Sequence, residues 1–505
     1  MNVRLGLVLA VAALFSGAGC AAGGGGSGPS GPSGPALPGG EVLEEGITPR
    51  DNTHTRAADL YLTQAQSATE DAEAEEKWAQ ALQAAQEGIA ADSMNPKSYF
   101  QAGIANVGLN NYQAADEMFD KAEELHPRYM LQTQPWREQA WVAAYNEAIN
   151  PMQQGNLEEA AEYFEAATRV YDGRPEAHLQ LGTVYSRLNQ MDDAVQAYEE
   201  AMGILETTKE AQMADTAAAP VWEEHWQIAT TGLGQALTFA ERYEDAADHY
   251  GHLLEEDPDN ITLMGSLAGA LSELARVKID SVETAVTDSV RAAELADSVA
   301  APYADSAKAL YDRILNQPGL TEADYFNAGV GLYQSENYDA AADAFRQAAE
   351  MNPFNRDAVL NLTQTLSISE SFEELIPAAR RLLEIDPRNA LGWIYLTRAL
   401  SETGQTEEAN QVFQEYQSFG YEVEQLNLQP DPSGGATITG VVKNTGLEPG
   451  TPVSLRFHFG GPDGEEVGTV DIQVQVPEVE QSEVFRGFFE SPEQVTGYTY
   501  EVLNP

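Results

Sequence analysis

One helical pattern recurs along most of this 505-residue chain at intervals of about 34 residues, and it limits the possible folds strongly. Each copy places small and aromatic residues at fixed positions along two amphipathic helices. The clearest copy, residues 175–201, has them at Leu181, Gly182, Tyr185, Ala194, Tyr198 and Ala201. A single helical unit of this length cannot bury its apolar face alone, so such units stack. The pattern therefore predicts a mainly α fold, a solenoid of helical hairpins over residues 49–422.

The same register returns in several other copies. One has Tyr99, Gly103, Ala115, Phe119 and Ala122, and another has Tyr325, Gly329, Ala341, Phe345 and Ala348. Gly or Ala lets paired helices approach closely, and the aromatic ring fills the space beside them. This pattern resembles the tetratricopeptide repeat (TPR). The resemblance implies a right-handed superhelix, or α-solenoid, of about nine hairpins.

Two insertions interrupt the period, near residues 207–220 and 276–303. In the second insertion, Val282, Val286 and Val290 fall at helical spacing. We expect this insertion to form a helical extension, which either only lengthens the fold or contacts a specific partner.

The composition changes after Gly420, where Pro430 and Pro432 precede alternating apolar residues. The alternation predicts strands at residues 436–443, 453–459, 467–476, 483–489 and 497–503. Short strands of this kind over residues 430–505 predict a small β-sandwich of immunoglobulin type. The runs VSLRFHFGG and VFRGFF resemble the FxLYD-like domains of bacterial envelope proteins. That resemblance implies an accessory or binding role.

The first nineteen residues have a short positive start, an apolar run from Leu5 to Phe15, and small residues up to Cys20. This order is typical of a secretory signal peptide, and the run is too short to span a bilayer. The segment resembles the lipobox of bacterial lipoproteins, although Gly17 stands where that family favours Leu. The resemblance implies that residues 1–19 are removed and Cys20 is lipidated. The alternative is a secreted protein without lipid.

By the same analogy, Ala21 after the cysteine favours sorting to the outer membrane, facing the periplasm. Residues 20–48 are rich in Gly, Ser and Pro, which predicts a flexible tether. The sequence therefore predicts an exported protein that is anchored to the cell envelope.

Acidic residues dominate the charged side chains. The chain has 80 Asp and Glu against 27 Lys and Arg, for a formal net charge of -53. Such a surface repels phosphate backbones and anionic headgroups, which excludes nucleic-acid binding and membrane contact through a basic patch. We expect membrane contact only through the N-terminal lipid. Either a salt-rich medium or a cationic partner would account for the acidity.

No catalytic constellation is recognisable. Cys20 is the single cysteine, which excludes disulfides and thiolate metal sites within the chain. His249 and His252 share a predicted helix but lack a third metal ligand at a recognisable spacing. Residues 257–260 read as a turn between repeats and lack the ligand pattern of a calcium loop. We therefore expect no enzyme activity, metal or cofactor.

The TPR resemblance implies that partners bind along a concave face lined by the first helix of each hairpin. Transferring the family register predicts that this groove is lined by Phe100, Ile104, Val107, Leu179, Thr183, Phe326, Val330, Tyr333, Ile394, Tyr395 and Arg398. Chaperone-binding members clamp a terminal carboxylate with Lys and Asn, which this set lacks. An apolar groove in an acidic surface favours peptide segments with hydrophobic anchors and basic flanks. The alternative is that these side chains only pack between repeats.

Three classes of function remain open from the sequence. The first is a non-catalytic scaffold or adaptor, anchored to the cell envelope, that binds partner segments in the groove. The second is a cell-wall or glycan-associated structural lipoprotein that acts through its β domain. The third is an enzyme whose site the sequence hides.

Overall fold

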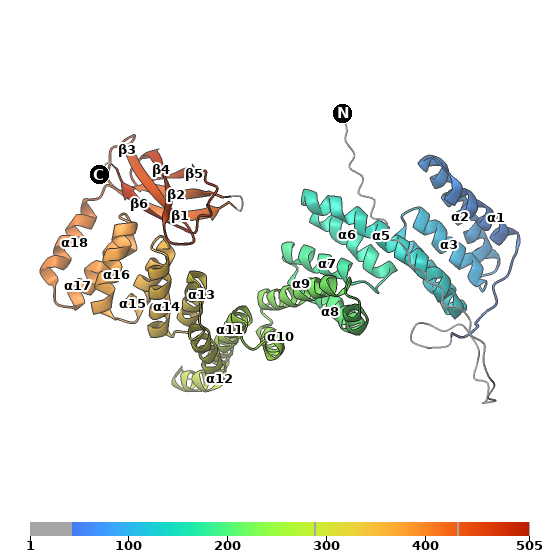
Figure 1. The fold of residues 1–505 in the computed structure, drawn as a ribbon, viewed down its shortest axis with the longest axis horizontal. Helices are drawn as coiled ribbons and strands as arrows, with labels where there is room; N and C mark the ends of the chain where they lie inside the picture. The colour runs from blue at the N-terminus through green and yellow to red at the C-terminus, as the bar shows by residue number, and fades with distance from the viewer. Residues whose placement is uncertain (1–42, 287–288, 432–433, 504–505) are drawn as a thin grey trace. The chain divides into compact units, whose positions relative to one another are not determined.

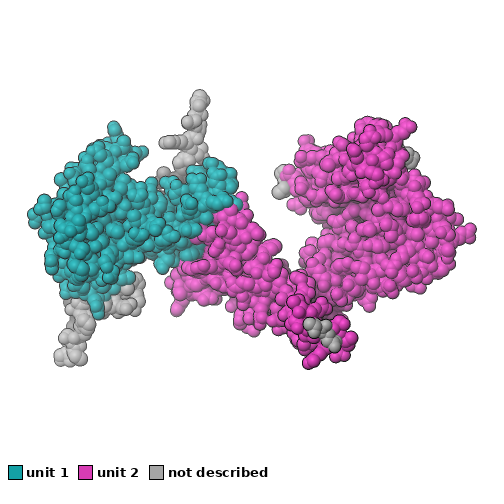
Figure 2. Space-filling view, turned by 180° about the vertical axis from the view of Figure 1, so that it is seen from behind, with its two compact units in different colours: residues 1–180 teal, residues 181–505 magenta. Residues whose placement is uncertain are grey.

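The structure is a computed structural model that describes residues 43–286, 289–431 and 434–503. These residues form eighteen α-helices, one short 3₁₀ helix and six β-strands (Figure 1). The chain divides into two compact units, Met1–Gln180 and Leu181–Pro505 (Figure 2). The predicted signal peptide, Cys20 and most of the predicted tether lie outside the described residues.

The first unit is helical, and each helix packs against the next. Its helices are α1 (Thr53–Ser67), α2 (Asp71–Ala91), α3 (Pro96–Gly108), α4 (Tyr112–Leu125), α5 (Met130–Gln154), α6 (Leu157–Val170) and the start of α7 (Pro175–Arg187), with a 3₁₀ turn at Pro127–Tyr129. The tether prediction needs a correction at its end. Leu43 is buried, and the amide of Ile47 donates to the carbonyl of Leu125 at 2.7 Å, so residues 43–48 lie against the end of α4.

The second unit continues the helical pairs and ends in the β-strands. Its helices are α8 (Met191–Ala214), α9 (Ala219–Phe239), α10 (Tyr243–Glu256), α11 (Ile261–Ala285), α12 (Ser289–Leu315), α13 (Glu322–Gln334), α14 (Tyr338–Met351), α15 (Arg356–Ile368), α16 (Phe372–Ile385), α17 (Ala390–Glu402) and α18 (Thr406–Ser418). The eighteen helices of the described residues correspond to the predicted nine or so hairpins.

The small residues of the repeat pattern lie directly against aromatic rings. A Cβ atom added to Gly103 would collide with the ring of Phe119, and one added to Gly329 would lie 2.8 Å from the ring of Phe345. Both rings are buried, at 0% and 1% exposure. Because a Cβ atom would collide with the ring, the glycines set how closely the helices of a pair approach. The packing predicted from the sequence is confirmed.

Asparagine side chains begin several of the first helices. The Oδ1 atom of Asn260 accepts from the amide of Leu263 at 3.1 Å, and that of Asn355 accepts from Ala358 at 2.8 Å. Asn389 does the same for Gly392 at 3.0 Å. Each bond satisfies an otherwise unpaired amide in the first turn of a helix. Asn260 thereby ends a turn between repeats, as the sequence predicts for residues 257–260.

Both insertions are helical. The first lengthens α8 and lies before α9, and the second lengthens α11 and α12 to 25 and 27 residues. The spacing of Val282, Val286 and Val290 is misleading, however. Val286 has extended backbone angles and ends α11, and α12 begins at Ser289. Because the chain reverses between the two helices, the three valines do not share one helix face.

Six strands form two three-stranded antiparallel sheets with the orders β1-β2-β5 and β4-β3-β6. The strands are β1 (Tyr421–Pro430), β2 (Ala436–Asn444), β3 (Pro452–Gly460), β4 (Glu466–Gln475), β5 (Ser482–Phe489) and β6 (Gly497–Val502). The two sheets share one apolar core, in which the rings of Phe457 and Phe485 lie 5.8 Å apart. The described strands therefore form a small β-sandwich.

Strand β1 is absent from the sequence prediction, which starts the β domain at residue 430. Its residues do alternate, with Tyr421 and Val423 buried, but the pairing register with β2 shifts between Glu424 and Asn427. Gln425 has a φ of +51° at this bulge. The bulge interrupts the period-two pattern on which strand prediction depends.

The β-sandwich is fixed to the last repeats through Phe354, in the loop between α14 and α15. The amide of Tyr498 donates to the carbonyl of Phe354 at 2.7 Å. A Cβ atom on Gly460 would collide with the Phe354 side chain, so this glycine makes room for the ring. The amide of Arg388, in the loop between α16 and α17, donates to the hydroxyl of Tyr500 at 3.0 Å. Strands and helical loops therefore form one joint.

A buried ion pair lies in this joint. The Nε atom of Arg356 lies 2.8 Å from Oδ2 of Asp386, and the two side chains are only 12% and 0% exposed. Burial by itself lowers the pKa of Arg356, but the Asp386 carboxylate raises it by more. The pKa therefore lies above its ordinary value, and the guanidinium stays charged. Removing one member of such a pair leaves an uncompensated buried charge.

We predict that Arg356→Met lowers the free energy of unfolding of the second unit by about 3–5 kcal/mol. The control is Arg346→Met, because Arg346 pairs with Glu374 at 2.6 Å on the surface and its loss should cost about 1 kcal/mol or less. Urea titration followed by circular dichroism measures both. Equal effects of the two substitutions would contradict a structural role for the buried pair.

Candidate partner-binding site

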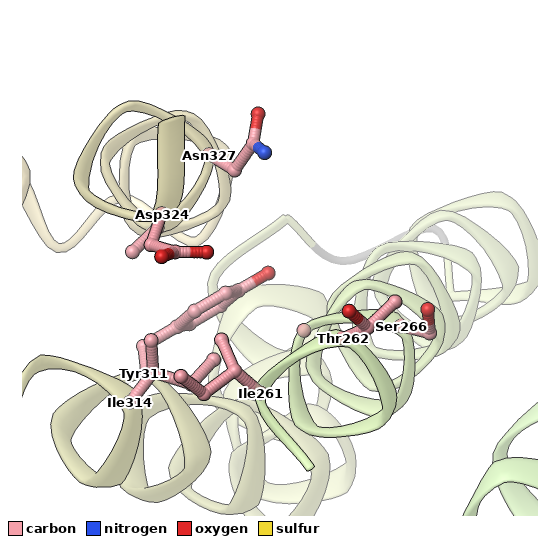
Figure 3. A pocket seen from close by; sticks show the side chains of 9 residues that line it. Ile261, Thr262, Ser266, Tyr311, Ile314, Asp324 and Asn327 are labelled. Atoms are coloured by element: carbon pink, nitrogen blue, oxygen red, sulfur yellow. The ribbon is translucent and has the colours of Figure 1, made fainter. Parts of the chain in front are cut away.

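A cavity of about 300 Å³ opens between the first helices of two neighbouring hairpins, α11 and α13. We call it the α11–α13 cavity. Helices α11, α12 and α13 each contribute to its lining (Figure 3). The lining residues are Ile261, Thr262, Gly265, Ser266, Tyr311, Ile314, Asp324, Asn327 and Ala328.

Glycine on α11 produces this cavity. A Cβ atom added to Gly265 would have no neighbour nearer than Ile314 Cδ1, at 4.0 Å. One turn further along α11, a Cβ atom on Gly269 would meet nothing within 4 Å. Unlike Gly103 and Gly329, these glycines do not serve close packing. Gly265 belongs to the cavity lining and leaves room there, whereas Gly269 lies outside that lining.

The cavity has an apolar base and a polar rim. Tyr311 and Ile314 of α12 are each 3% exposed and form the base. Burial raises the pKa of Tyr311 to about 12, so its hydroxyl stays protonated at neutral pH. Thr262 and Ser266 lie along the α11 side, and Asp324 lies above the Tyr311 ring on the α13 side (Figure 3). A base and rim of this kind suit an apolar group with a polar or cationic neighbour.

Asp324 also holds the start of α13. Its Oδ2 atom accepts from the amide of Thr321 at 2.8 Å and from the Thr321 hydroxyl at 2.7 Å, which forms a capping box. The position of this carboxylate at the rim is therefore fixed by the helix cap.

The predicted groove residues of α13 lie outside the lining of this cavity, to which α13 contributes Asp324, Asn327 and Ala328. Phe326, Val330 and Tyr333 are partly buried and pack against the core of the second unit. Tyr395 of α17 packs against the same core, and its pKa is raised by burial and then by the neighbouring Tyr333. Parts of these side chains therefore line the surface while the rest stabilises the fold.

The other predicted residues of α17 differ from one another. Ile394 is 47% exposed and offers apolar surface. Arg398 lies over the ring of Phe372 at 5.1 Å and forms an ion pair with Glu370 at 3.5 Å. Its charge is thus partly compensated within the fold.

In the first unit, the predicted groove residues are mostly inaccessible. Ile104 and Val107 of α3 are 5% and 4% exposed, and Leu179 of α7 is 3% exposed. A ligand gains nothing from side chains that neighbouring helices already cover, so this part of the prediction is corrected. Phe100 is partly buried and stacks on Tyr129 at 4.7 Å. Thr183, on the part of α7 that belongs to the second unit, is also partly buried and lies at hydrogen-bond distance from the Tyr198 hydroxyl, 3.3 Å.

The α11 part of the cavity is missing from the sequence prediction. The family register places mostly apolar residues at the groove positions of α3, α7, α13 and α17. At the same positions α11 has Gly265 and Gly269. The sequence nevertheless contains a signal. Two glycines lie four residues apart inside one helix, although glycine lowers the stability of a helix interior.

Within residues 43–286, 289–431 and 434–503, no cluster of three or more His, Cys, Asp or Glu is arranged to hold a metal ion. The Nε2 atom of His249 donates a hydrogen bond to the carbonyl of Thr230 at 2.8 Å, and burial lowers the pKa of His249. Within the same residues, no helix combines the length and the apolar character needed to cross a membrane.

Two family models match the chain, both described as tetratricopeptide repeat. One matches residues 145–205 and 326–366, and the other matches residues 96–129. A comparison with curated proteins gives no match. The matched segments cover parts of both units and include the predicted groove residues of α3, α7 and α13.

Several solved structures resemble the chain at low identity. The C-terminal part of a repeat protein from Cytophaga hutchinsonii is 15% identical, with 61% of this chain and 99% of that chain covered and a TM-score of 0.30. YrrB, described as a TPR protein with an unusual peptide-binding site, is 21% identical over 46% and 96% of the chains, with a TM-score of 0.27. Yeast Tom70 is 14% identical over 75% and 71%, with a TM-score of 0.28.

We predict that Gly265→Ala and Gly269→Ala each raise the free energy of unfolding of the second unit by about 0.5–1 kcal/mol. Alanine favours a helix interior over glycine by this amount, and the added methyl group meets open space at both positions. Thermal unfolding would measure the change. Gly329→Ala is the control. Its methyl group would collide with Phe345, so this substitution should lower the free energy of unfolding of the second unit. Destabilisation by Gly265→Ala would show that the cavity is not open at this position.

Proposed function

Because the chain carries tetratricopeptide repeats, we propose that it is a non-catalytic adaptor that binds a segment of another protein along the first helices of its hairpins. Such repeats are typically protein-binding scaffolds. The binding surface proposed here lies in the second unit and includes the α11–α13 cavity with Phe326, Val330 and Tyr333 of α13.

The observation that carries the proposal is the α11–α13 cavity. Its volume of about 300 Å³ lies at the lower end of the range for ligand pockets, which run from about 300 to 1,000 Å³. The buried Tyr311 and Ile314 give it a fixed apolar base. A cavity of this size accepts one large apolar side chain of a partner, which would act as an anchor.

Charge favours a basic partner segment. The chain has a formal net charge of -53, and Asp324 places a carboxylate at the cavity rim. Opposite charge around an apolar anchor speeds association and discriminates against wrong partners. The proposed ligand is therefore a segment that carries an apolar anchor with basic neighbours.

We also propose that the protein is exported and held at the cell envelope by a lipid on Cys20, with the outer membrane as its site. The support is the signal-peptide and lipobox pattern around Cys20. Two acyl chains or more on one residue give durable anchoring. The described chain begins at Leu43, which packs on the first unit, so the proposed tether would lead into that unit.

The β-sandwich is proposed to be an immunoglobulin-like domain of the FxLYD-like kind. Its sheet orders are β1-β2-β5 and β4-β3-β6. Phe457 and Phe459, from the run that carries the resemblance, are both fully buried in its core. This domain would support binding and supply no chemistry.

We predict that Gly265→Leu, which fills the α11–α13 cavity, weakens binding of a partner peptide at least tenfold. The peptide is the tightest binder selected from a random twelve-residue library against the purified chain, and fluorescence anisotropy measures its Kd. The matched control is Gly251→Leu in α10, because Gly251 also lies in a helix with nothing within 4 Å of an added Cβ atom.

Unchanged affinity in Gly265→Leu, or equal losses in both variants, would contradict the proposed site. Failure to select any peptide would contradict the peptide-binding function itself. Circular dichroism on both variants checks that the helices are intact.

For the anchor, we predict that Cys20→Ala moves the protein from the envelope fraction of the host cells to the soluble fraction. The reason is that the lipid is the sole membrane contact expected for so acidic a chain. Fractionation with immunoblotting measures the change, and Ser16→Ala in the same segment serves as the control. Continued envelope association of the Cys20→Ala protein would contradict lipid anchoring.

A further inference from the structure

A second cavity, of about 270 Å³, lies between the helical repeats and the β-sandwich of the second unit. We call it the α13–β1 cavity. Strand β1 forms one wall, and α13 with the start of α15 forms the other. The lining residues are Phe326, Phe354, Asn355, Arg356, Asp357, Leu426, Asn427, Leu428, Pro430, Thr496, Gly497 and Tyr498. Aromatic and aliphatic side chains thus come from both the repeats and the sandwich.

The two walls are held at a fixed separation. Thr496, Gly497 and Tyr498 belong to the lining and also to the joint with the repeats. The Tyr498 amide bonds to the Phe354 carbonyl at 2.7 Å, and the Asn352 amide group donates to the Thr496 hydroxyl at 3.2 Å. The cavity is therefore preformed, which lowers the entropy cost of binding a ligand.

Helix α13 separates the two cavities. Phe326 lines the α13–β1 cavity, whereas the next residues, Asn327 and Ala328, line the α11–α13 cavity. A helix with its side chains is about 10–12 Å across. An extended chain advances about 3.3 Å per residue, so three to four residues of a peptide would cross α13. A segment that occupied both cavities would therefore span α13 with three to four residues.

The β1 wall is suited to side-chain contacts and not to the addition of a strand. Its pairing with β2 is interrupted by the bulge at Gln425, where φ is +51°, and Pro430 has no amide to donate. Both features block edge-to-edge pairing. A peptide on this wall would be held through Leu426, Leu428 and their neighbours.

The charges of the α13–β1 cavity favour a cationic residue. Among the described residues that line the two cavities, the single cation is Arg356. It is paired with Asp386 and with Asp357, both at 2.8 Å. The Asp357 side chain is 63% exposed at the rim, and Asp324 lies at the rim of the other cavity. A carboxylate on the ligand would therefore be repelled, and an ammonium or guanidinium group attracted.

From these observations we propose that the β-sandwich forms the second wall of the partner-binding site. One partner segment places an apolar side chain in each cavity, three to four residues apart in extended conformation, with a basic residue beside Asp357. This inference rests on the proposed function of the α11–α13 cavity and assigns a binding role to β1.

The test uses the full chain purified in detergent and the selected twelve-residue peptide as the probe. Asn427→Arg puts a cation on the β1 wall of the α13–β1 cavity. Gln429→Arg is the matched control, because Gln429 is exposed on the same strand and lies outside the cavity lining. We expect Asn427→Arg to weaken the peptide about tenfold at low salt, and less at high salt, because like charges repel and salt screens them. Gln429→Arg should change the affinity less than twofold.

A peptide in which norleucine replaces the basic residue gives an independent readout. The Asn427→Arg loss should shrink to less than twofold with that peptide, which a folding defect would not produce. Equal affinities of Asn427→Arg and Gln429→Arg, with binding still weakened at least tenfold by Gly265→Leu, would overturn the role of β1 and leave the proposed function intact. If Gly265→Leu also has no effect, the proposed α11–α13 site fails as well.

Discussion

Close packing of a glycine against an aromatic ring holds each well-formed hairpin together, and the rest of the structure depends on it. Gly103 lies against Phe119, Gly182 against Tyr198 and Gly329 against Phe345, each closer than a Cβ atom would permit. The contact fixes the distance between the two helices of a hairpin and buries the ring. The remaining face of the first helix is then left for neighbouring repeats or for a ligand.

Helix α11 uses glycine in the opposite way. Gly265 lines the α11–α13 cavity, and a Cβ atom there would meet nothing nearer than 4.0 Å, whereas Gly329 packs directly against a ring. The result is a cavity whose base, Tyr311 and Ile314, comes from the second helix of the same hairpin. The long insertion that lengthens α11 and α12 does not fill this space. The α11–α13 cavity thus interrupts the face formed by the first helices and leaves room for an anchor side chain of a partner.

The joint around Phe354 makes the β-sandwich part of the second unit. Gly460 accommodates the Phe354 ring, and the buried Arg356–Asp386 pair lies beside it. A charged pair so deeply buried adds little net stability but strongly penalises any arrangement that separates its members. The buried pair therefore favours one defined geometry of the joint. A cavity whose walls come from both the repeats and the β-sandwich requires such a geometry.

Much of this architecture could be predicted from the sequence because its determinants are local. The Gly and aromatic spacing predicts the hairpins, and alternation predicts five of the six strands in the described residues. What failed depends on tertiary context. Val286 sits at helical spacing, yet the chain turns there.

The candidate site shows the same division. Phe326, which the family register places in the groove, lines the α13–β1 cavity, whereas Ile104 and Val107 are covered by neighbouring helices. Periodicity gives the face of a helix on which a residue lies and does not show whether another helix covers that face. The α13–β1 cavity, which is formed by four separate segments between Phe326 and Tyr498, leaves no pattern in the sequence.

The most direct test of the central claim is site-specific photo-cross-linking in the native host cells. Benzoylphenylalanine is placed at Thr262, an exposed residue of the α11–α13 cavity, or at Val484, which is 71% exposed on β5 and lines neither cavity. Binding at the cavity predicts one reproducible cross-linked partner from Thr262 that is absent from Val484. No cross-linked protein from Thr262, or the same set from both positions, would contradict the claim.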